Sequence, residues 1–405
     1  MTRFVVRILS VTPYAPPHIG GLEVLVDSLA SCLARRGHDI TVVASPAGLD
    51  DGSGTGPPPA DYRIVYVPAA YRLLESRLGV PYPLFAPSLI RVLRRELSVA
   101  DVVHAHGFLF QSTLAALALA RRSAPRPVTV LTEHVGHVPY ANRALDIAEA
   151  AAIRTLGRWS ARVADAVVVY NANVRATIAG LARDSRLVWI DPGVDTDFFR
   201  PPAGKERGRL RAEFGWDDRP RVLFGGRPVP KKGLDIALQA ARSGGGAFML
   251  AVVGAIHAPA GAPNVERLGL LSRERMSEAL RAADVLLMPS RGEGLPVTIQ
   301  EALASGLPVV ATDDPGYRAL LEGFGPALRL MPADGVAMGE ALVEVVRDRA
   351  IRAAAEANVA LARQRFSLDA YALGHERLYQ ELLAGRAGQD GSGGESRSRK
   401  LEATT

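Results

Sequence analysis

The sequence is poor in cysteine and in aromatic residues. Its 405 residues include a single cysteine, Cys32, so an intramolecular disulfide and a cysteine-rich metal site are both excluded. Cys32 lies in the apolar helical pattern SLASCLARRGH, and we expect it to be a small buried residue. Aromatic residues make up 6% of the chain, and no basic stripe is interleaved with them, so we expect no nucleic-acid binding.

Apolar runs long enough for membrane insertion are also missing. The N-terminus, MTRFVVRILSV, contains Arg3 and Arg7 and lacks the apolar run of about 7–15 residues that a signal peptide needs. No stretch reaches about 18 uninterrupted apolar residues, the length of a membrane-spanning helix. We therefore expect a cytoplasmic protein. The formal net charge of +6 is modest for this length and suits phosphate-bearing ligands or an anionic membrane surface.

Short apolar runs alternate with helical patterns along most of the chain. Seven runs form a first series and five form a second, and the polar stretch TDFFRPPAGKERGRLRAEFGWDDRPR separates the two. Short all-apolar strands alternating with helices predict a parallel sheet covered on both faces. We therefore predict an α/β protein with two Rossmann-like, doubly wound domains that face each other across a cleft.

The predicted boundaries follow from composition and from this alternation. The last segment, RAGQDGSGGESRSRKLEATT, is rich in glycine and serine and has almost no apolar content, so we expect it to be disordered. We predict an N-terminal acceptor-side domain (1–195), an interdomain connection (196–219) and a C-terminal donor domain (220–368). A helix that crosses back to the first domain (369–385) and a disordered tail (386–405) follow.

Two glutamates eight residues apart stand out in PSRGEGLPVTIQEALASGLPVVATD. Glu293 lies on a glycine-rich loop after a strand, and Glu301 falls inside the helix that follows. Ligands of parallel sheets bind at the carboxyl ends of the strands, and the start of a helix attracts anions. Backbone amides that bind phosphates, together with carboxylates that accept hydrogen bonds from sugar hydroxyls, would suit a nucleotide sugar. The simpler interpretation is that Glu293 caps the helix and Glu301 is a surface residue.

Family resemblance favours the first interpretation. The stretch EGLPVTIQEALASGLPVVATD resembles the E-x7-E signature of retaining GT-B glycosyltransferases of family 4. The resemblance implies that Glu293 contacts the donor sugar and that Glu301 holds the ribose hydroxyls. It also implies that Gly294, Leu295 and Pro296 belong to the donor site.

Two further segments resemble the same family. LFGGRPVPKKGLDIALQA is similar to its donor-phosphate element, with Arg227 and Lys232 as the two cations; Lys231 is the less favoured ligand. Charge-assisted bonds from both cations would stabilise a departing diphosphate. TPYAPPHIGGLEVLVDSLASCLARRGH resembles the loop that leads from the first strand into the first helix, where Gly20 and Gly21 would approach the donor phosphate.

Histidines follow two strands of the first series. His134, in VTVLTEHVGHVPY, matches the active-site histidine of the family, whereas Glu133 and His137 are weaker candidates. His104 and His106, in DVVHAHG, could suggest a metal site, but no third ligand has suitable spacing, so we expect a structural role for them. The resemblance covers about residues 4–384, and DPGVDTDFFRP, with a structural Asp195, would open the interdomain connection.

The resemblance implies a hexosyltransferase that uses a nucleotide diphosphate sugar, with a UDP sugar favoured, and transfers it with retention. It implies no divalent metal, no other cofactor and no protein general base. The acceptor, a sugar, lipid-linked sugar or small-molecule hydroxyl, and the oligomeric state are not readable. Residues 71–97 mix arginine with apolar residues and could touch an anionic bilayer, or form an ordinary surface helix. The alternatives are a nucleotide-sugar 2-epimerase and a non-catalytic nucleotide-sugar-binding protein.

Overall fold

The chain divides into two compact units. Unit 1 comprises residues 1–169, 174–190 and 371–405, and unit 2 comprises residues 170–173 and 191–370. The sequence predicts the corresponding boundaries at 195 and 369. The structure is a computed structural model, and the residues that it describes, with side chains as far as Ala387, are 5–16, 18, 20–47, 61–70, 82–135, 142–182, 186–226, 230–254, 264–291 and 297–401.

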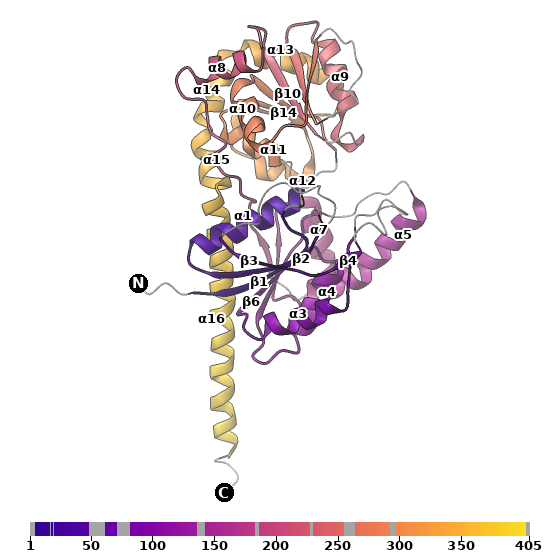
Figure 1. Ribbon diagram of the computed structural model, residues 1–405, viewed down its shortest axis with the longest axis vertical. Coiled ribbons are helices and arrows are strands. Elements are labelled where there is room, and N and C mark those ends of the chain that lie inside the picture. Colours follow the sequence, from indigo (N-terminus) through magenta and orange to yellow (C-terminus); the bar gives the residue numbers. More distant parts are fainter. Residues whose placement is uncertain are drawn as a thin grey trace. The chain divides into compact units, whose positions relative to one another are not determined.

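A parallel sheet of seven described strands forms the centre of unit 1 (Figure 1), in the order β3-β2-β1-β6-β7-β8-β9. All seven strands of the first predicted series are present, so the prediction of a parallel α/β domain is confirmed. The bounds are β1 Arg7–Tyr14, β2 Asp39–Ser45, β3 Arg63–Tyr66, β6 Val102–His106, β7 Val128–Thr132, β8 Ala166–Val169 and β9 Arg186–Trp189. A short antiparallel pair accompanies them: β4 Ala69–Ala70 and β5 Leu84–Phe85.

Helices cover both faces of this sheet, and strand alternation decides which residues each face receives. Leu9 and Val11 of β1 pack in one cluster with the helices α3 and α4. The intervening Ser10 lies on the opposite face, where it lines a small cavity together with Leu29 of α1 and Tyr379 of α16. The helices are α1 Gly21–Arg35, α3 Ser88–Leu97, α4 Gln111–Ala120, α5 Arg143–Ala152, the π-helical turn η1 Ile153–Gly157, α6 Arg158–Val163, α7 Ala172–Leu181 and α16 Leu368–Leu401.

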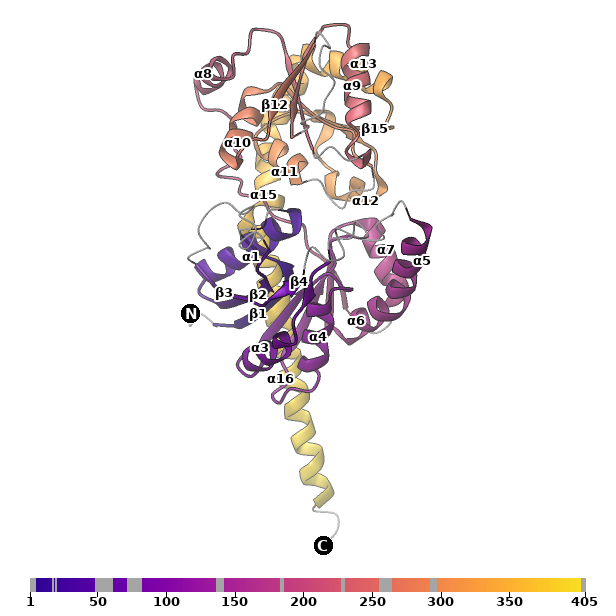
Figure 2. The same ribbon diagram turned by 45° about the vertical axis from the view of Figure 1, so that its right-hand side comes forward.

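The long helix α16 returns to unit 1 and lies along its sheet (Figures 1 and 2). Glu376 forms an ion pair of 2.6 Å with Arg36, and Arg386 forms one of 2.8 Å with Asp165. The helix extends to Leu401 and so includes part of the segment 386–405. Disorder in that tail stays a prediction. Among the described residues, no helix is both long and apolar enough to cross a membrane.

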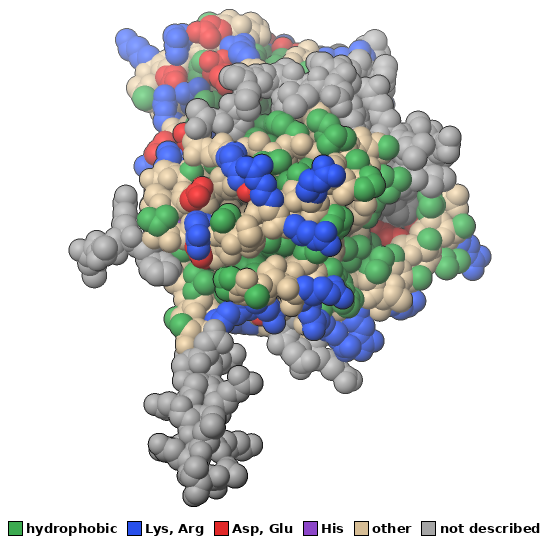
Figure 3. Space-filling view, turned by 60° about the horizontal axis from the view of Figure 1, so that its bottom comes forward, with side chains coloured by type: hydrophobic (Ala, Val, Ile, Leu, Met, Phe, Trp, Pro, Cys, Tyr) green, Lys and Arg blue, Asp and Glu red, His purple; other side chains and the backbone are tan. Residues whose placement is uncertain are grey.

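The helix α3 presents a basic surface. It buries Leu89 and Leu93 against the sheet and exposes Arg91, Arg94 and Arg95. Because β6 begins shortly after α3 ends, Arg94 and Arg95, in the last turn of α3, lie toward the edge formed by the amino ends of the strands. Figure 3 views the side of unit 1 that carries α3, where Arg side chains stand among hydrophobic ones. Part of the predicted contact segment, residues 71–81, lies outside the described residues.

Unit 2 repeats the architecture with a parallel sheet of six described strands, in the order β12-β11-β10-β13-β14-β15. The five predicted strands of the second series are present, and β15 is an addition that the sequence pattern did not predict. The strands are β10 Arg221–Gly225, β11 Met249–Val253, β12 Val265–Gly269, β13 Val285–Met288, β14 Val309–Thr312 and β15 Leu328–Met331. The longer helices are α8 Glu206–Glu213, α9 Leu234–Ser243, α10 Arg273–Ala282, α11 Val297–Ala304, α13 Gly335–Arg347, α14 Arg349–Ala357 and α15 Val359–Phe366.

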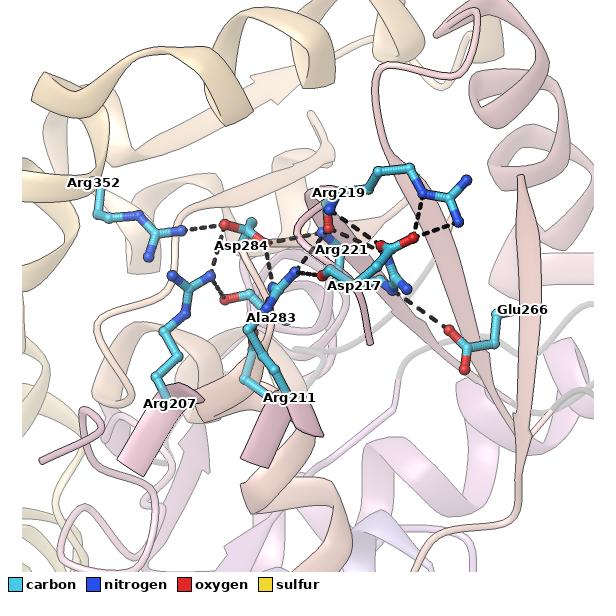
Figure 4. A network of polar contacts seen from close by, with 10 residues as sticks. Arg207, Arg211, Asp217, Arg219, Arg221, Glu266, Ala283, Asp284 and Arg352 are labelled. Carbon is cyan, nitrogen blue, oxygen red and sulfur yellow. Dashed lines mark hydrogen bonds and ion pairs between the residues drawn. The ribbon is translucent and has the colours of Figure 1, made fainter. Parts of the chain in front are cut away.

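A half-buried carboxylate, that of Asp284, fastens α8 of the connection to unit 2 (Figure 4). Asp284, directly before β13, accepts hydrogen bonds from Arg207 at 2.7 Å, Arg211 at 3.0 Å and Arg352 at 2.5 Å, and from the backbone N–H of Arg221 at 2.9 Å. Burial alone would raise the pKa of Asp284, but the charges of Arg207 and Arg352 and the Arg221 N–H outweigh it, so the pKa lies below its usual range. The carboxylate therefore stays charged and holds α8, α14 and the sheet together.

Candidate functional site

The carboxyl ends of β6 and β7 bring three predicted residues of unit 1 together. His104 and His106 belong to β6, and because they are two residues apart their side chains point to the same face of the sheet. His134 follows β7, which pairs directly with β6. All three histidines are at least 95% buried, so their ring nitrogens must find partners inside the protein.

Each of these rings has defined neighbours. His106 Nδ1 lies 3.1 Å from His134 Nε2, and His106 Nε2 lies 3.2 Å from the Ser10 hydroxyl. The rings of His104 and His106 are 4.2 Å apart between centroids. His104 is engaged on both nitrogens, with Thr132 Oγ1 at 2.6 Å and the Tyr379 hydroxyl at 2.7 Å. His104 and His106 therefore belong to two separate chains of hydrogen-bonded side chains, and the chain that contains His106 includes His134.

A fourth histidine, His375 of α16, completes a cluster of buried rings, with its centroid 5.3 Å from that of His104. Burial lowers the pKa of all four histidines: to about 3 for His134, to about 4 for His375, and well below the usual value for His104 and His106. Charge repulsion within the cluster adds to this effect for His104, His106 and His134. All four rings are consequently neutral near pH 7.

Glu133, the weaker candidate beside His134, organises the loops instead. Its carboxyl oxygens accept the backbone N–H groups of Phe108 at 2.7 Å and Val135 at 3.1 Å, which ties the loop after β6 to the loop after β7. Burial raises the pKa of Glu133 to about 8, although these backbone N–H groups partly oppose the shift. His137, the other weaker candidate, lies outside the described residues.

The loop between β1 and α1 places Gly20 and Gly21 at the start of a helix. Gly20 is the N-cap of α1, which begins at Gly21. A Cβ atom at Gly20 would lie 2.2 Å from the Glu23 carboxyl oxygen Oε2, so Gly20 leaves room for that side chain. Glu23 is buried and its Oε1 lies 2.9 Å from His18 Nδ1, while the His18 ring stacks on Tyr14 at 4.5 Å.

In unit 2, glycines let the backbones at the ends of three strands approach closely. A Cβ atom at Gly233 would lie 2.3 Å from the carbonyl oxygen of Pro289, and one at Gly254 would lie 2.8 Å from the carbonyl oxygen of Gly226. Both Gly233 and Gly254 have positive φ angles, of 72° and 82°, which favour glycine. The half-buried side chain of Lys232 packs against Gly226: a Cβ atom placed on that glycine would lie 3.2 Å from Lys232 Cβ.

The turn that carries Lys232 is joined to the loop that leads toward Glu293. The backbone N–H of Arg291 donates to the carbonyl of Lys231 at 2.8 Å, while the side chain of Lys231 is exposed. The predicted donor-site residues on the two loop tips lie outside the described residues, and their roles stay predictions: Arg227, Glu293, Gly294, Leu295 and Pro296.

Glu301 lies on α11, the helix that follows β13. Since β13 pairs with β10, the helix start and the Lys232 turn belong to the same carboxyl edge of the sheet. Glu301 is half-buried, not a fully exposed surface residue. Burial raises its pKa to about 7, and the charge of Arg273 partly opposes this shift. A carboxyl group with this pKa exchanges its proton near neutral pH.

Within the part of the chain that the structure describes, no group of His, Cys, Asp and Glu residues is arranged to hold a metal ion. The pair His104 and His106, which could suggest one, is occupied by hydrogen bonds to other side chains. Cys32 is buried, as expected. Asp195 accepts the backbone N–H of Phe198 at 3.0 Å and so holds the turn that opens the connection.

Comparisons with known proteins identify the family. Residues 19–198 match the family model described as Glycosyltransferase Family 4, and residues 219–348 match Glycosyl transferases group 1. A D-inositol 3-phosphate glycosyltransferase of Mycolicibacterium smegmatis is 31% identical over 350 residues, which cover 80% of this chain and 79% of the relative. The chain belongs to glycosyltransferase family 4. It is therefore a glycosyltransferase, and the resemblance seen in its motifs is confirmed.

Other relatives and solved structures agree with this assignment. A GDP-mannose-dependent alpha-(1-6)-phosphatidylinositol monomannoside mannosyltransferase of Mycobacterium tuberculosis is 28% identical over 370 residues, covering 85% of the glycosyltransferase and 91% of the relative. Sucrose-phosphate synthase from Thermosynechococcus elongatus has a TM-score of 0.73 at 20% identity, covering 94% and 100% of the two chains. HepE from Anabaena, solved with UDP, has a TM-score of 0.71 at 17% identity, covering 93% and 100%. These structures support the GT-B fold.

Sequence reasoning found the residues that follow strands but missed their supports. Ser10, Thr132 and Tyr379, which bond the histidines, were not predicted. A weak signal existed for Ser10, because β1 and β6 are neighbouring strands and Ser10 pairs in register with His104. No comparable signal existed for Tyr379, which lies 275 residues from its partner His104.

Proposed function

We propose that this glycosyltransferase transfers a hexose from a nucleotide diphosphate sugar to a hydroxyl acceptor, with retention of the anomeric configuration. The observation that carries the proposal is the position of Lys232 in unit 2. Its half-buried side chain lies against Gly226 at the carboxyl end of β10, where parallel sheets bind their ligands. A cation there can neutralise a diphosphate as it departs.

The neighbouring residues would divide the donor between them. Lys232 and Arg227 would bind the diphosphate, and Glu301 would accept hydrogen bonds from the ribose hydroxyls. Glu293 would contact the transferred hexose, and His134 of unit 1 would stabilise it near the reacting carbon. In the retaining enzymes that this sequence resembles, a phosphate oxygen of the donor assists removal of the acceptor proton. We therefore assign no protein general base.

The names of the relatives narrow the choice of donor and acceptor to be tested. A UDP sugar is the donor that the family resemblance favours, whereas the M. tuberculosis relative is GDP-mannose-dependent by name. Both bases therefore belong in the test. For the acceptor we propose a hydroxyl of an inositol-type or sugar-type polyol, since the names of two relatives specify inositol phosphate and phosphatidylinositol acceptors.

We further propose that transfer needs no divalent metal, because Lys232 and Arg227 would supply the positive charge that a metal provides in other enzymes. Transfer should continue when EDTA replaces added Mg²⁺ or Mn²⁺. A loss of transfer in EDTA that added metal restores would refute this part of the proposal.

Peripheral contact with an anionic bilayer through α3 is a separate proposal. It rests on the exposed Arg91, Arg94 and Arg95, since basic side chains near a charged bilayer contribute about 1 kcal/mol each. The protein should sediment with liposomes that contain anionic lipid and not with neutral ones, and a triple Arg→Gln variant should lose this binding. Equal sedimentation with both lipids would contradict the proposal.

A matched pair of lysines tests the transfer itself. Lys232→Met should lower kcat/KM by at least about a hundredfold, since it removes a charge that acts on the leaving diphosphate. Lys231→Met, one residue away and exposed, should stay within about threefold of the wild type. Equal losses in the two variants would contradict the role of Lys232.

The same assay separates the alternatives. UDP- and GDP-sugars are screened first for thermal stabilisation and then for transfer to inositol phosphate and sugar acceptors. NMR of the product reports the anomeric configuration, and an inverted product would refute retention. Isomerised sugar without transfer would indicate a 2-epimerase, and binding without turnover would indicate a non-catalytic protein.

A further inference from the structure

We propose that His106, held in place by Ser10, is a positioning residue that fixes the ring orientation of His134 and couples the tautomer of His134 to its own. The inference deepens the proposed function, because it concerns the histidine that would stand beside the transferred sugar. It depends on one continuous line of contacts inside unit 1: Ser10 Oγ to His106 Nε2 at 3.2 Å, and His106 Nδ1 to His134 Nε2 at 3.1 Å.

Both rings of this line are fixed by burial. His106 is 1% exposed and His134 is 5% exposed, so water does not compete for the nitrogens that face each other. The ring centroids lie 5.3 Å apart with 31° between the ring planes, and the shared contact joins one nitrogen from each ring. His106 has its other nitrogen on the Ser10 hydroxyl, on the neighbouring strand β1.

Proton counting then couples the two tautomers. Both imidazoles are neutral near pH 7, because burial lowers both pKa values, and a neutral imidazole carries one N–H. Only one proton can occupy the contact between His106 Nδ1 and His134 Nε2. In the ring that supplies this proton, the other nitrogen is unprotonated. In the ring that accepts it, the other nitrogen carries the N–H.

Two arrangements satisfy this rule. If His106 donates, its Nε2 accepts from the Ser10 hydroxyl and His134 carries a proton on Nδ1. If His134 donates, His106 donates from Nε2 to Ser10 and His134 Nδ1 carries no proton. Ser10 allows both because a hydroxyl donates and accepts. Whether His134 offers a donor or an acceptor on Nδ1 is therefore decided together with the state of His106 and Ser10.

His104 provides a matched control for this inference. It is as buried as His106, at 1% exposed, and its ring is the near neighbour of the His106 ring. Its two nitrogens bond Thr132 and Tyr379 instead of His134. Replacing either histidine by phenylalanine disturbs the same buried region, but only the replacement at 106 removes the contact with His134.

The experiment reads the tautomer directly. The full chain is labelled with ¹⁵N-histidine, His134 is assigned from the signals lost in His134→Gln, and long-range ¹H–¹⁵N spectra distinguish Nδ1–H from Nε2–H. Wild type should show one tautomer for His134. His106→Phe should give a mixture or the opposite tautomer, whereas His106→Asn, which keeps a polar group near the Nδ1 position, and His104→Phe should keep the wild-type tautomer.

Transfer kinetics provide the second readout. His106→Phe should lower kcat by about tenfold to a hundredfold, the range for supports of a site residue, while KM for the donor changes by less than about threefold. His104→Phe should keep kcat within about threefold. Ser10→Ala, which removes only a hydroxyl and should fold, should change the His134 tautomer or lower kcat in the same direction as His106→Phe.

The two readouts separate this inference from the proposed function. An unchanged His134 tautomer in both His106→Phe and Ser10→Ala would overturn the positioning role, whatever the rates. A changed tautomer with an unchanged kcat would support positioning and refute the part that His134 is given in transfer. An equal loss of kcat in His104→Phe and His106→Phe would also overturn the inference, because it would indicate a general packing defect.

Discussion

Acidification should destabilise unit 1 through its buried histidines. His104, His106, His134 and His375 are 1%, 1%, 5% and 0% exposed, and all four have lowered pKa values in the folded protein. The unfolded chain regains the ordinary value of about 6.5. Below this pH the unfolded state binds more protons than the folded state, so the free energy of unfolding falls as pH falls.

The magnitude follows from proton linkage. Between about pH 7.5 and pH 5.5, one histidine that protonates only when unfolded removes about 1.3 kcal/mol, so four remove about 5 kcal/mol. Glu133 acts in the opposite direction, because its pKa is raised to about 8 and its folded state binds a proton that the unfolded state lacks. This restores about 2.5 kcal/mol over the same interval, which leaves a net loss of about 2 to 3 kcal/mol.

Tryptophan fluorescence during urea unfolding measures this loss. The chain has three tryptophans, and Trp216→Phe leaves Trp159 and Trp189, both of which belong to unit 1. In this background the unfolding free energy of unit 1 should fall by about 2 to 3 kcal/mol on acidification. Adding Glu133→Gln should enlarge the fall to about 5 kcal/mol, and His375→Gln should reduce it by about 1.3 kcal/mol. A pH-independent free energy in the Glu133→Gln variant would refute the reasoning.

Three further predictions concern unit 2. Asp284→Asn should cost about 1–3 kcal/mol by leaving three arginines without their charged partner, whereas Glu344→Gln, an exposed member of a surface pair, should cost less than about 1 kcal/mol in the same calorimetric assay; equal costs would contradict the clamp interpretation. Glu301 has a pKa of about 7, so calorimetric affinity for the nucleotide sugar should rise as pH increases through 7 and the carboxylate forms, and Glu301→Gln should abolish this dependence; a persistent slope would assign it elsewhere. Gly233→Ala should destabilise unit 2 more than Gly245→Ala, since both glycines have positive φ but only Gly233 faces a carbonyl oxygen at 2.3 Å; similar melting temperatures would show that the backbone contact yields easily.

The sequence predicted the parts of the fold that depend on local pattern. Twelve strands were readable because each is a short apolar run between turn residues, and parallel sheets bury both faces. The strand β15, Leu328–Met331, was missed because Arg329 interrupts the apolar run and prolines flank it, which is typical of a loop. The alternation of strands and helices predicted parallel sheets, but it did not predict the order of the strands within each sheet.

The candidate site was predictable only at the level of which residues follow strands. His134 and Lys232 could be named because motifs place them there, and Glu301 because of its spacing from Glu293. The contacts that hold them could not be predicted, since they depend on side-chain packing between segments distant in the chain. His104 and His106 were expected to be structural; both are hydrogen-bonded to other side chains, and the sequence did not predict that His106 contacts the candidate site residue His134.

The return of α16 to unit 1 has a consequence for biosynthesis. Most of the first unit precedes residue 190, yet Tyr379 and His375, which complete its buried rings, are translated only after unit 2. At about 5–20 residues per second, ribosomes need about 10–40 seconds to travel from residue 190 to residue 379. During that interval the nascent first unit has an uncovered sheet surface, so it cannot finish folding before unit 2 has been synthesised.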